Sequence, residues 1–197
     1  MSGVGRARAP GGAFEGEALV VWARSGGRPV FLAALHHTAS PFGPFVEIVA
    51  GEFRSRPGLR PRLRQTTLAM SGGPAREAGA QVATLKWWAD EPLREVHWEE
   101  RGIRLRAEVK RVAVPAIVPS DLLHPGWAGA EADPARRLPA KVHLARIDVD
   151  VPPGDDELGR FAGRRPGFVV TTAAQIGGDA WLHLVRALRL PAVPEPA

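Results

Sequence analysis

Apolar and polar residues alternate along several stretches of this chain, as they do in β-strands that bury one face. The alternation is strictest over residues 102–114, where apolar positions alternate with charged ones. The apolar positions are Ile103, Leu105, Ala107 and Val109, and the charged positions are Arg104, Arg106, Glu108 and Lys110. Residues 94–99 precede this stretch, so the pattern predicts a hairpin whose charged face is exposed to solvent.

Similar runs predict seven further strands, at residues 18–24, 29–37, 45–53, 62–70, 143–151, 168–175 and 181–190. The first two runs flank Ser-Gly-Gly-Arg, which indicates a second hairpin. Residues 75–83 are rich enough in alanine to predict a short helix beginning at Pro74, although Gly79 disfavours it. Residues 86–88 are expected at the end of that helix or in a loop. Residues 115–140 hold five prolines and are expected to form a long loop.

These elements predict a mainly β, antiparallel fold of eight or nine strands with one or two short helices. A chain of 197 residues fits one domain. We place that domain at residues 13–191, between flexible tails at residues 1–12 and 192–197.

Composition excludes several kinds of chemistry. The chain has no cysteine, which rules out disulfides, thiolate metal sites and a cysteine nucleophile. The six histidines form no recognised metal-binding spacing, so we expect no metal and no cofactor. No apolar run approaches the roughly 18 residues of a membrane span, and the start lacks a hydrophobic signal core. These features favour a cytoplasmic protein with no membrane partner.

The net charge of +5 is concentrated near residues 54–64, where five arginines lie among turn-forming residues. Such a cluster attracts anions. However, no aromatic residue lies between Phe53 and Trp87 to stack on a base, and only three of the 26 basic residues are lysines, which indicates a general bias toward arginine. We therefore interpret residues 54–64 as an exposed rim and do not expect nucleic-acid binding.

Glu47 is the most informative ionisable residue of the sequence. In the strand predicted at residues 45–53 it shares a face with Phe45 and Val49, so it is the lone acid among apolar neighbours. Desolvating a carboxylate in such a position is costly unless it has a cationic or hydrogen-bonding partner. Glu47 is therefore either a paired structural acid or a site residue, and the sequence leaves both readings open.

The segment that contains Glu47, residues 40–47, is Ser-Pro-Phe-Gly-Pro-Phe-Val-Glu. It resembles the small-Pro-x-Gly-Pro-aromatic-x-Glu segment of the acetoacetate decarboxylase superfamily, with Phe45 where members commonly have tyrosine. Residues 93–109 resemble the hairpin after the family's active-site loop, and residues 163–168 resemble its late turn. The resemblance covers roughly residues 19–190. It implies a closed antiparallel β-barrel of the acetoacetate decarboxylase-like type around a central pocket.

Enzymes of this superfamily decarboxylate a β-keto acid through a Schiff base on an activated lysine. Two registers of the chain on the family's motif place Ala83 or Glu91 at the position of that lysine, and neither side chain can form an imine. Glu15 falls at the position of an upstream arginine. The resemblance therefore implies a divergent member that lacks the usual Schiff-base lysine.

Lys86 is the lysine nearest to the active-site segment. Trp87 and Trp88 could desolvate its amine and lower its pKa, but an ordinary lysine beside packing tryptophans explains the same pattern. The candidate catalytic residues are therefore Glu47 and Lys86. The candidate substrate-binding residues are His37, Phe42, Phe45, Arg76 and Trp87.

We expect a protein that binds a small organic acid or carbonyl compound in a barrel pocket and that is not a true acetoacetate decarboxylase. One alternative is a divergent lyase or hydratase that uses Glu47 as acid or base; any enzyme activity would be of the decarboxylase, aldolase or dehydratase type. Another is an arginine-rich module that binds nucleic acid or a protein partner. A homo-oligomer is compatible with the sequence, which does not determine the oligomeric state.

Overall fold

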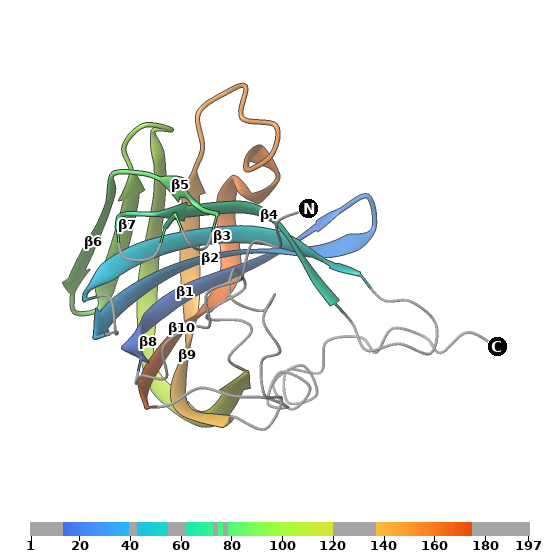
Figure 1. Ribbon diagram of the computed structural model, residues 1–197. Coiled ribbons are helices and arrows are strands. Elements are labelled where there is room, and N and C mark those ends of the chain that lie inside the picture. The colour runs from blue at the N-terminus through green and yellow to red at the C-terminus, as the bar shows by residue number, and fades with distance from the viewer. Residues whose placement is uncertain are drawn as a thin grey trace.

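The computed structural model describes residues 14–39, 43–54, 62–72, 75–76, 79–119 and 137–174, and the structural statements below concern these residues. Their strands form one ten-stranded sheet in the order β5-β4-β3-β2-β1-β10-β9-β8-β7-β6 (Figure 1). The strands are β1 (Phe14–Ser25), β2 (Arg28–Ala39), β3 (Phe45–Arg54), β4 (Arg62–Met70), β5 (Gln81–Val82), β6 (Leu85–Asp90), β7 (Leu93–Trp98), β8 (Ile103–Pro119), β9 (Arg137–Asp150) and β10 (Gly163–Ala174). The mainly β fold is confirmed.

Strand pairing is antiparallel everywhere except between β4 and β5, which are parallel. The hairpin predicted around Ser-Gly-Gly-Arg is β1–β2, in which Ser25 pairs with Arg28. Its two turn residues, Gly26 and Gly27, have φ of 57° and 78°. Glycine adopts this left-handed conformation without strain, and such turns match the twist of a hairpin.

The hairpin predicted from residues 94–114 is β7–β8. As expected, Ile103, Leu105 and Ala107 are buried whereas Arg104 and Arg106 are exposed. The strand is longer than predicted, however. Because β8 continues to Pro119 and β9 begins at Arg137, the loop predicted over residues 115–140 is wrong at both ends. Residues 120–136 lie outside the described part of the chain.

The helix predicted at residues 75–83 is also wrong where the structure describes it. Residues 75–76 and 79 form turns, and Gln81–Val82 form β5. Gly79 has a φ of 66°, which is not helical, and the amide of Ala83 donates to the carbonyl of Met70 (2.9 Å), which holds the segment against β4. Residues 86–88 lie in β6 instead of a loop. Among the described residues the single helix is a 3-10 turn, η1 (Gly159–Phe161).

The sheet curls because its two edge strands are close in sequence. β5 and β6 lie at opposite ends of the strand order, yet only Ala83 and Thr84 separate them. The amide of Glu99 donates to the carbonyl of Thr84 (3.1 Å), so this connection is held against the β7–β8 turn. No ladder joins β5 to β6 within the described ranges. The sheet is therefore a curled, open half-barrel, and the predicted closure is not confirmed.

Two apolar clusters lie on opposite faces of the sheet. One contains Trp98 and Leu105 together with Leu32 and Ile48, so strands distant in the sheet order pack against each other on this face. We call it the Trp98 face. The other cluster contains Phe45 and Val49, between which Glu47 lies on β3. We call it the Glu47 face.

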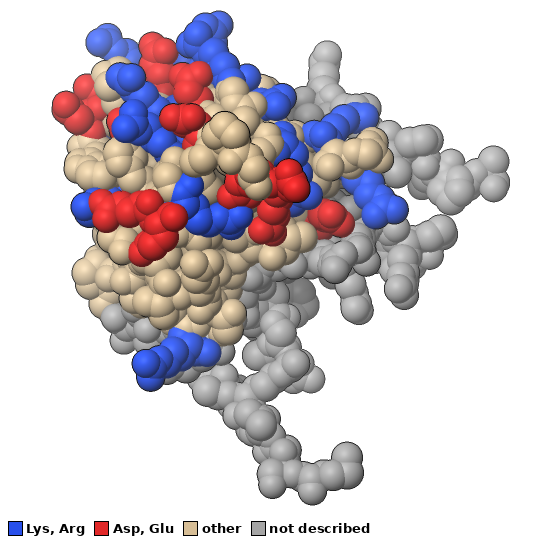
Figure 2. Space-filling model, turned by 90° about the horizontal axis from the view of Figure 1, so that it is seen from above, with Lys and Arg blue, Asp and Glu red and all other residues tan. Residues whose placement is uncertain are grey.

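One face of the described residues carries mixed charge. Figure 2 shows Lys and Arg interspersed with Asp and Glu over the face seen from above. The rim predicted at residues 54–64 lies mostly outside the described residues, so its interpretation stays a prediction. In the part of the chain that the structure covers, no helix has the length and apolar character needed to cross a membrane.

Candidate functional site

Glu47 lies in a row of seven residues that crosses the sheet from β4 to β8. Each member is the register partner of the next, and paired residues project to the same side of a sheet. The members are Met70, Glu47, Leu35, Ala18, Val170, Val142 and Val114. We call this the Glu47 row. Glu47 is the one polar residue of this row, and the six other members of the row are apolar.

Burial is complete at Glu47. Its exposed fraction is 0%, and its neighbours Met70, Leu35 and Phe45 are exposed by 0%, 2% and 4%. Burial raises the pKa of the Glu47 carboxyl above its ordinary value of 4.5, while the hydrogen bond to His37 and its nearby charge act in the opposite direction. A carboxyl in this position therefore keeps its proton at a higher pH than an exposed glutamate.

His37 is the described partner of Glu47. The distance between His37 Nε2 and Glu47 Oε2 is 3.2 Å, and the two side chains are 5% and 0% exposed. The imidazole also stacks on Phe45, with ring centroids 4.2 Å apart and planes at 30°. The second carboxyl oxygen, Oε1, has no hydrogen-bond partner in the described part of the structure. One oxygen of this buried acid is thus engaged and the other is available.

The segment after β4 fixes the strand that carries Glu47. The amide of Val46 donates to Ser71 Oγ (2.8 Å), and the amide of Ser71 donates to the carbonyl of Val46 (2.9 Å). Before β3, Gly43 has a φ of 82°, a value that glycine accepts without strain and that sets the direction in which the chain enters the strand. Local contacts on both sides therefore position the carboxyl.

Of the predicted site residues, the structure brings together Glu47, His37 and Phe45. Trp87 lies on the Trp98 face, where it stacks on His36 with ring centroids 5.4 Å apart. The sheet therefore separates Trp87 from Glu47. Arg76 is exposed, and Phe42 lies outside the described residues.

Lys86 alternates with Leu85 and Trp87 on β6, so it points away from the Trp98 face on which those two residues pack. Its amine forms an ion pair with Glu99, and its side chain is 51% exposed. This is the arrangement of a solvated surface lysine. The structure does not bring Lys86 together with Glu47.

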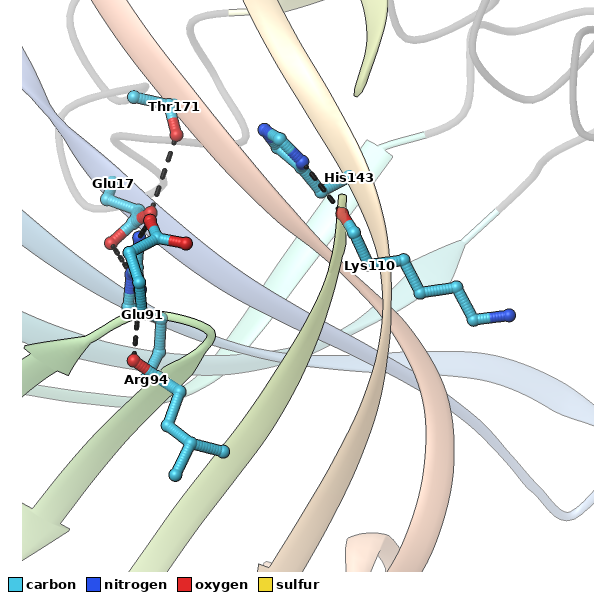
Figure 3. A network of polar contacts seen from close by, with 7 residues as sticks. Glu17, Glu91, Arg94, Lys110, His143 and Thr171 are labelled. Carbon is cyan, nitrogen blue, oxygen red and sulfur yellow. Dashed lines mark hydrogen bonds and ion pairs between the residues drawn. The ribbon is translucent and has the colours of Figure 1, made fainter. Parts of the chain in front are cut away.

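Sequence reasoning missed a second polar cluster, which lies on the Trp98 face (Figure 3). Arg94 Nε donates to Glu17 Oε2 (2.6 Å), Nη2 donates to Glu91 Oε1 (2.7 Å) and Nη1 donates to the carbonyl of Leu93 (3.0 Å). The hydrogen bond from Arg94 and its charge lower the pKa of Glu91. Thr171 Oγ1 donates to the other oxygen of Glu17 (3.4 Å).

All three guanidinium nitrogens of Arg94 have protein acceptors, so this cluster is a clamp between β1 and β7. The sequence held a signal for it, because Arg94 shares a strand face with Val96 and Trp98. This is the same kind of pattern that singled out Glu47. Glu91 is one of the two residues that the sequence alignment placed at the position of the family's lysine. In the structure it is an exposed member of the clamp.

His36 and Trp87 form an aromatic pair beside this clamp. Burial, and secondarily the charge of His37, lowers the pKa of His36, while Glu17 acts in the opposite direction. Trp87 Nε1 is buried and finds no acceptor within the described ranges. No group of three or more His, Asp or Glu side chains in the described part of the chain could hold a metal ion. Of the two polar clusters, the His37–Glu47 pair is the more deeply buried.

Comparison with known proteins found a likeness in structure but none in sequence. No family model matches the chain, and no curated protein matches its sequence. A solved structure described as "Enduracididine biosynthesis enzyme MppR complexed with pyruvate" is similar, with a TM-score of 0.49 and 12% sequence identity over 86% of this chain and 90% of that chain. A likeness of this size supports no conclusion about function.

Proposed function

We propose that the protein binds a small organic acid or carbonyl compound against Glu47, and that Glu47 serves there as an acid or hydrogen-bond donor. The observation that carries the proposal is Oε1 of Glu47, which has no partner among the described residues although the carboxyl is fully buried in an apolar row. Native proteins rarely leave such an atom unsatisfied, because the lost hydrogen bond costs about 1–3 kcal/mol. A ligand oxygen would supply the missing partner.

The physical properties of the site suit a carbonyl oxygen. A protonated carboxyl donates one hydrogen bond, and it does so more strongly in apolar surroundings than in water. Leu35, Phe45 and Met70 surround Glu47 and would contact the carbon atoms of such a ligand. Because Glu47 is fully buried, a ligand reaches Oε1 only when packed side chains move, so we expect slow association.

A divergent lyase or hydratase is the second candidate, and the His37–Glu47 pair favours it. A buried acid beside an imidazole can hold and transfer a proton, which is the function of a general acid or base. Glu47 would give its proton to the carbonyl oxygen of the substrate, and His37 would replace that proton. For the nucleic-acid alternative, the described residues offer no comparable observation. It remains an alternative from the sequence that we do not expect.

The test is ligand binding to matched variants. Saturation-transfer NMR with acetone, pyruvate and acetoacetate measures binding, and consumption of each probe measures turnover. We expect Glu47→Leu to lose at least about tenfold in affinity, the equivalent of one hydrogen bond of about 1.4 kcal/mol. The control Glu99→Gln, which removes an exposed carboxylate that is not a member of the row, should bind as the native protein does.

Glu47→Gln separates the two candidate functions, because an amide still donates a hydrogen bond but cannot transfer a proton. A simple binder keeps most of its affinity in this variant. A lyase or hydratase keeps its affinity and loses turnover. If none of the three probes binds the native protein, or if Glu47→Leu binds them equally well, the proposal is wrong.

A further inference from the structure

One edge strand of the sheet, β6, pairs with β7 on one side and with no strand on the other in the described part of the chain. It is the last strand in the sheet order, and Figure 1 shows it at the outer edge of the ribbon, beside β7. The other edge strand, β5, has only two residues, whereas β6 has six. A free edge of this length offers backbone groups with which another chain can pair.

The pairing of β6 with β7 shows which backbone groups face the free edge. The amide of Glu99 donates to the carbonyl of Thr84 (3.1 Å), immediately before the β6–β7 ladder begins. Hydrogen-bonded and non-hydrogen-bonded pairs alternate along an antiparallel ladder, so every second residue counted from Thr84 bonds to β7. Trp87 and Ala89 are not among these residues. Their amides and carbonyls therefore point away from β7, toward an edge that no described strand covers.

The side chains along β6 leave this edge accessible. Lys86, Trp88, Ala89 and Asp90 are all exposed. Trp88 is 46% exposed, and its ring contacts His97 on β7, with ring centroids 4.4 Å apart. Tryptophan is enriched at protein interfaces, where it contributes a large apolar area. The free edge therefore combines unpaired backbone groups with a side chain suited to binding another protein.

The charges around Trp88 fit a second copy of the same strand. Lys86 lies two residues before Trp88 and Asp90 lies two residues after it, so all three share one face of β6. When two copies pair antiparallel with Trp88 opposite its counterpart, Lys86 of each copy lies opposite Asp90 of the other. Lys86 already forms an ion pair with Glu99, but an ammonium group has three donors and can serve both carboxylates. The charges of β6 are therefore self-complementary.

This register also pairs the free backbone groups. It places Trp87 of one copy opposite Ala89 of the other, and these are the residues whose amides and carbonyls face the free edge. They form the hydrogen-bonded pairs, whereas Trp88 and its counterpart form the non-hydrogen-bonded pair on the two-fold axis. A shift by two residues keeps the hydrogen bonds but places Trp88 opposite a charged residue. The charges therefore select the symmetric register.

We propose that the protein forms a two-fold symmetric dimer through β6, in which the sheets of two copies join at the Trp88 edge. The same surface serves both copies, as in other closed dimers with two-fold symmetry. Because the contact consists of one short strand from each copy, association is weak and reversible. The proposal does not depend on ligand binding at Glu47, which lies on β3.

Sedimentation equilibrium of the full chain at concentrations up to about 1 mM measures the dimer. Ala89→Pro removes an amide that faces the free edge and leaves the hydrogen bonds from β6 to β7 in place. It should weaken dimerisation at least about tenfold, because symmetry removes two hydrogen bonds. Ala89→Val keeps the amide and is the matched control, which should dimerise as the native protein does. A monomer at every concentration, or a dimer that Ala89→Pro leaves unchanged, overturns the proposal.

Exchange of charges tests the register. Lys86→Glu places an acid opposite Asp90, and Asp90→Lys places a base opposite Lys86. Each variant alone should dimerise at least about tenfold more weakly than the native protein, since like charges lie opposite each other in both pairs. An equimolar mixture of the two variants restores opposite charges in both pairs and should dimerise as the native protein does. A mixture that dimerises no better than the single variants shows that the proposed register is wrong.

Disulfide trapping gives an independent measurement, because the chain contains no cysteine of its own. The Cα atoms of a non-hydrogen-bonded pair are about 4.5 Å apart, which is within the range of a disulfide. Mild oxidation of Trp88→Cys should therefore link two copies. Leu144→Cys is the matched control, since Leu144 is 49% exposed but lies on β9, which has a strand on each side. Equal cross-linking of the two variants, or none in Trp88→Cys, contradicts a two-fold axis at Trp88.

Discussion

His37 Nε2 lies 3.2 Å from Glu47 Oε2, although the two residues are not register partners. In the β2–β3 ladder His37 pairs with Phe45, and Glu47 pairs with Leu35. The contact is therefore a diagonal one, beside the buried apolar residues Leu35, Phe45 and Met70. Burial, which removes water from the carboxyl, and secondly the contact with His37 therefore determine the pKa of Glu47.

The first prediction concerns pH. The pKa of Glu47 is raised on folding, so between pH 4.5 and its folded pKa the folded chain holds a proton that the unfolded chain releases. The contribution of Glu47 to the free energy of unfolding is therefore complete below pH 4.5 and is lost as pH rises through the folded pKa. Urea unfolding is measured at pH values from about 4 to about 8. As pH rises, the free energy of unfolding of Glu47→Gln should increase relative to that of the native protein. A difference that stays constant or shrinks with pH contradicts this prediction.

The second prediction uses the pair as a double-mutant cycle. His37→Leu should lower the free energy of unfolding by about 1–3 kcal/mol, because it leaves Oε2 of a buried carboxyl without its described partner, as Oε1 already is. The double variant, His37→Leu with Glu47→Leu, should be closer to neutral, as replacement of both members of a buried polar pair by apolar residues of similar volume often is. Chemical denaturation of both single variants and the double variant measures the coupling. If Glu47→Leu costs as much as His37→Leu, Glu47 is a structural acid.

The third prediction is that the protein forms no Schiff base. Lys86 is held by Glu99 on an exposed surface, and Ala83 and Glu91 cannot form an imine. Borohydride reduction with acetoacetate or pyruvate, followed by mass spectrometry, should therefore show no adduct. Lys110→Ala and Lys141→Ala serve as controls for unspecific labelling. An adduct on the native chain that disappears only in Lys86→Ala would show that an imine forms at Lys86.

The fourth prediction compares two ion pairs of different burial. Arg94→Leu leaves Glu17 partly buried without its cation, and the side chains of this pair are 11% and 14% exposed. We expect a loss of about 2–3 kcal/mol in the free energy of unfolding, somewhat below the cost of breaking a fully buried pair. Lys86→Leu, which breaks the exposed pair with Glu99, should change it by less than about 0.5 kcal/mol. Equal effects would show that Arg94 is not a clamp.

Strand alternation is a local property, so the sequence alone identified the positions of most described strands and the burial of Glu47. The strand at residues 45–53 corresponds to β3, and Glu47 has no exposed surface. The opposite directions of His36 and His37 follow from the same period of two. Residues 181–190, predicted as a strand, lie outside the described residues.

Tertiary structure decided what depends on partners distant in sequence. β8 and β9 extend into residues expected to form a loop because each supplies the other's hydrogen-bonding edge, which overrides the local effect of Pro115 and Pro139. Residues 75–83 are not helical in their described part because Ala83 is bound to Met70. A period of two also cannot tell which face of a strand meets which cluster. The curl of the sheet therefore decided that Trp87 lies on the face of the sheet away from Glu47. It also decided that Arg94 reaches Glu17.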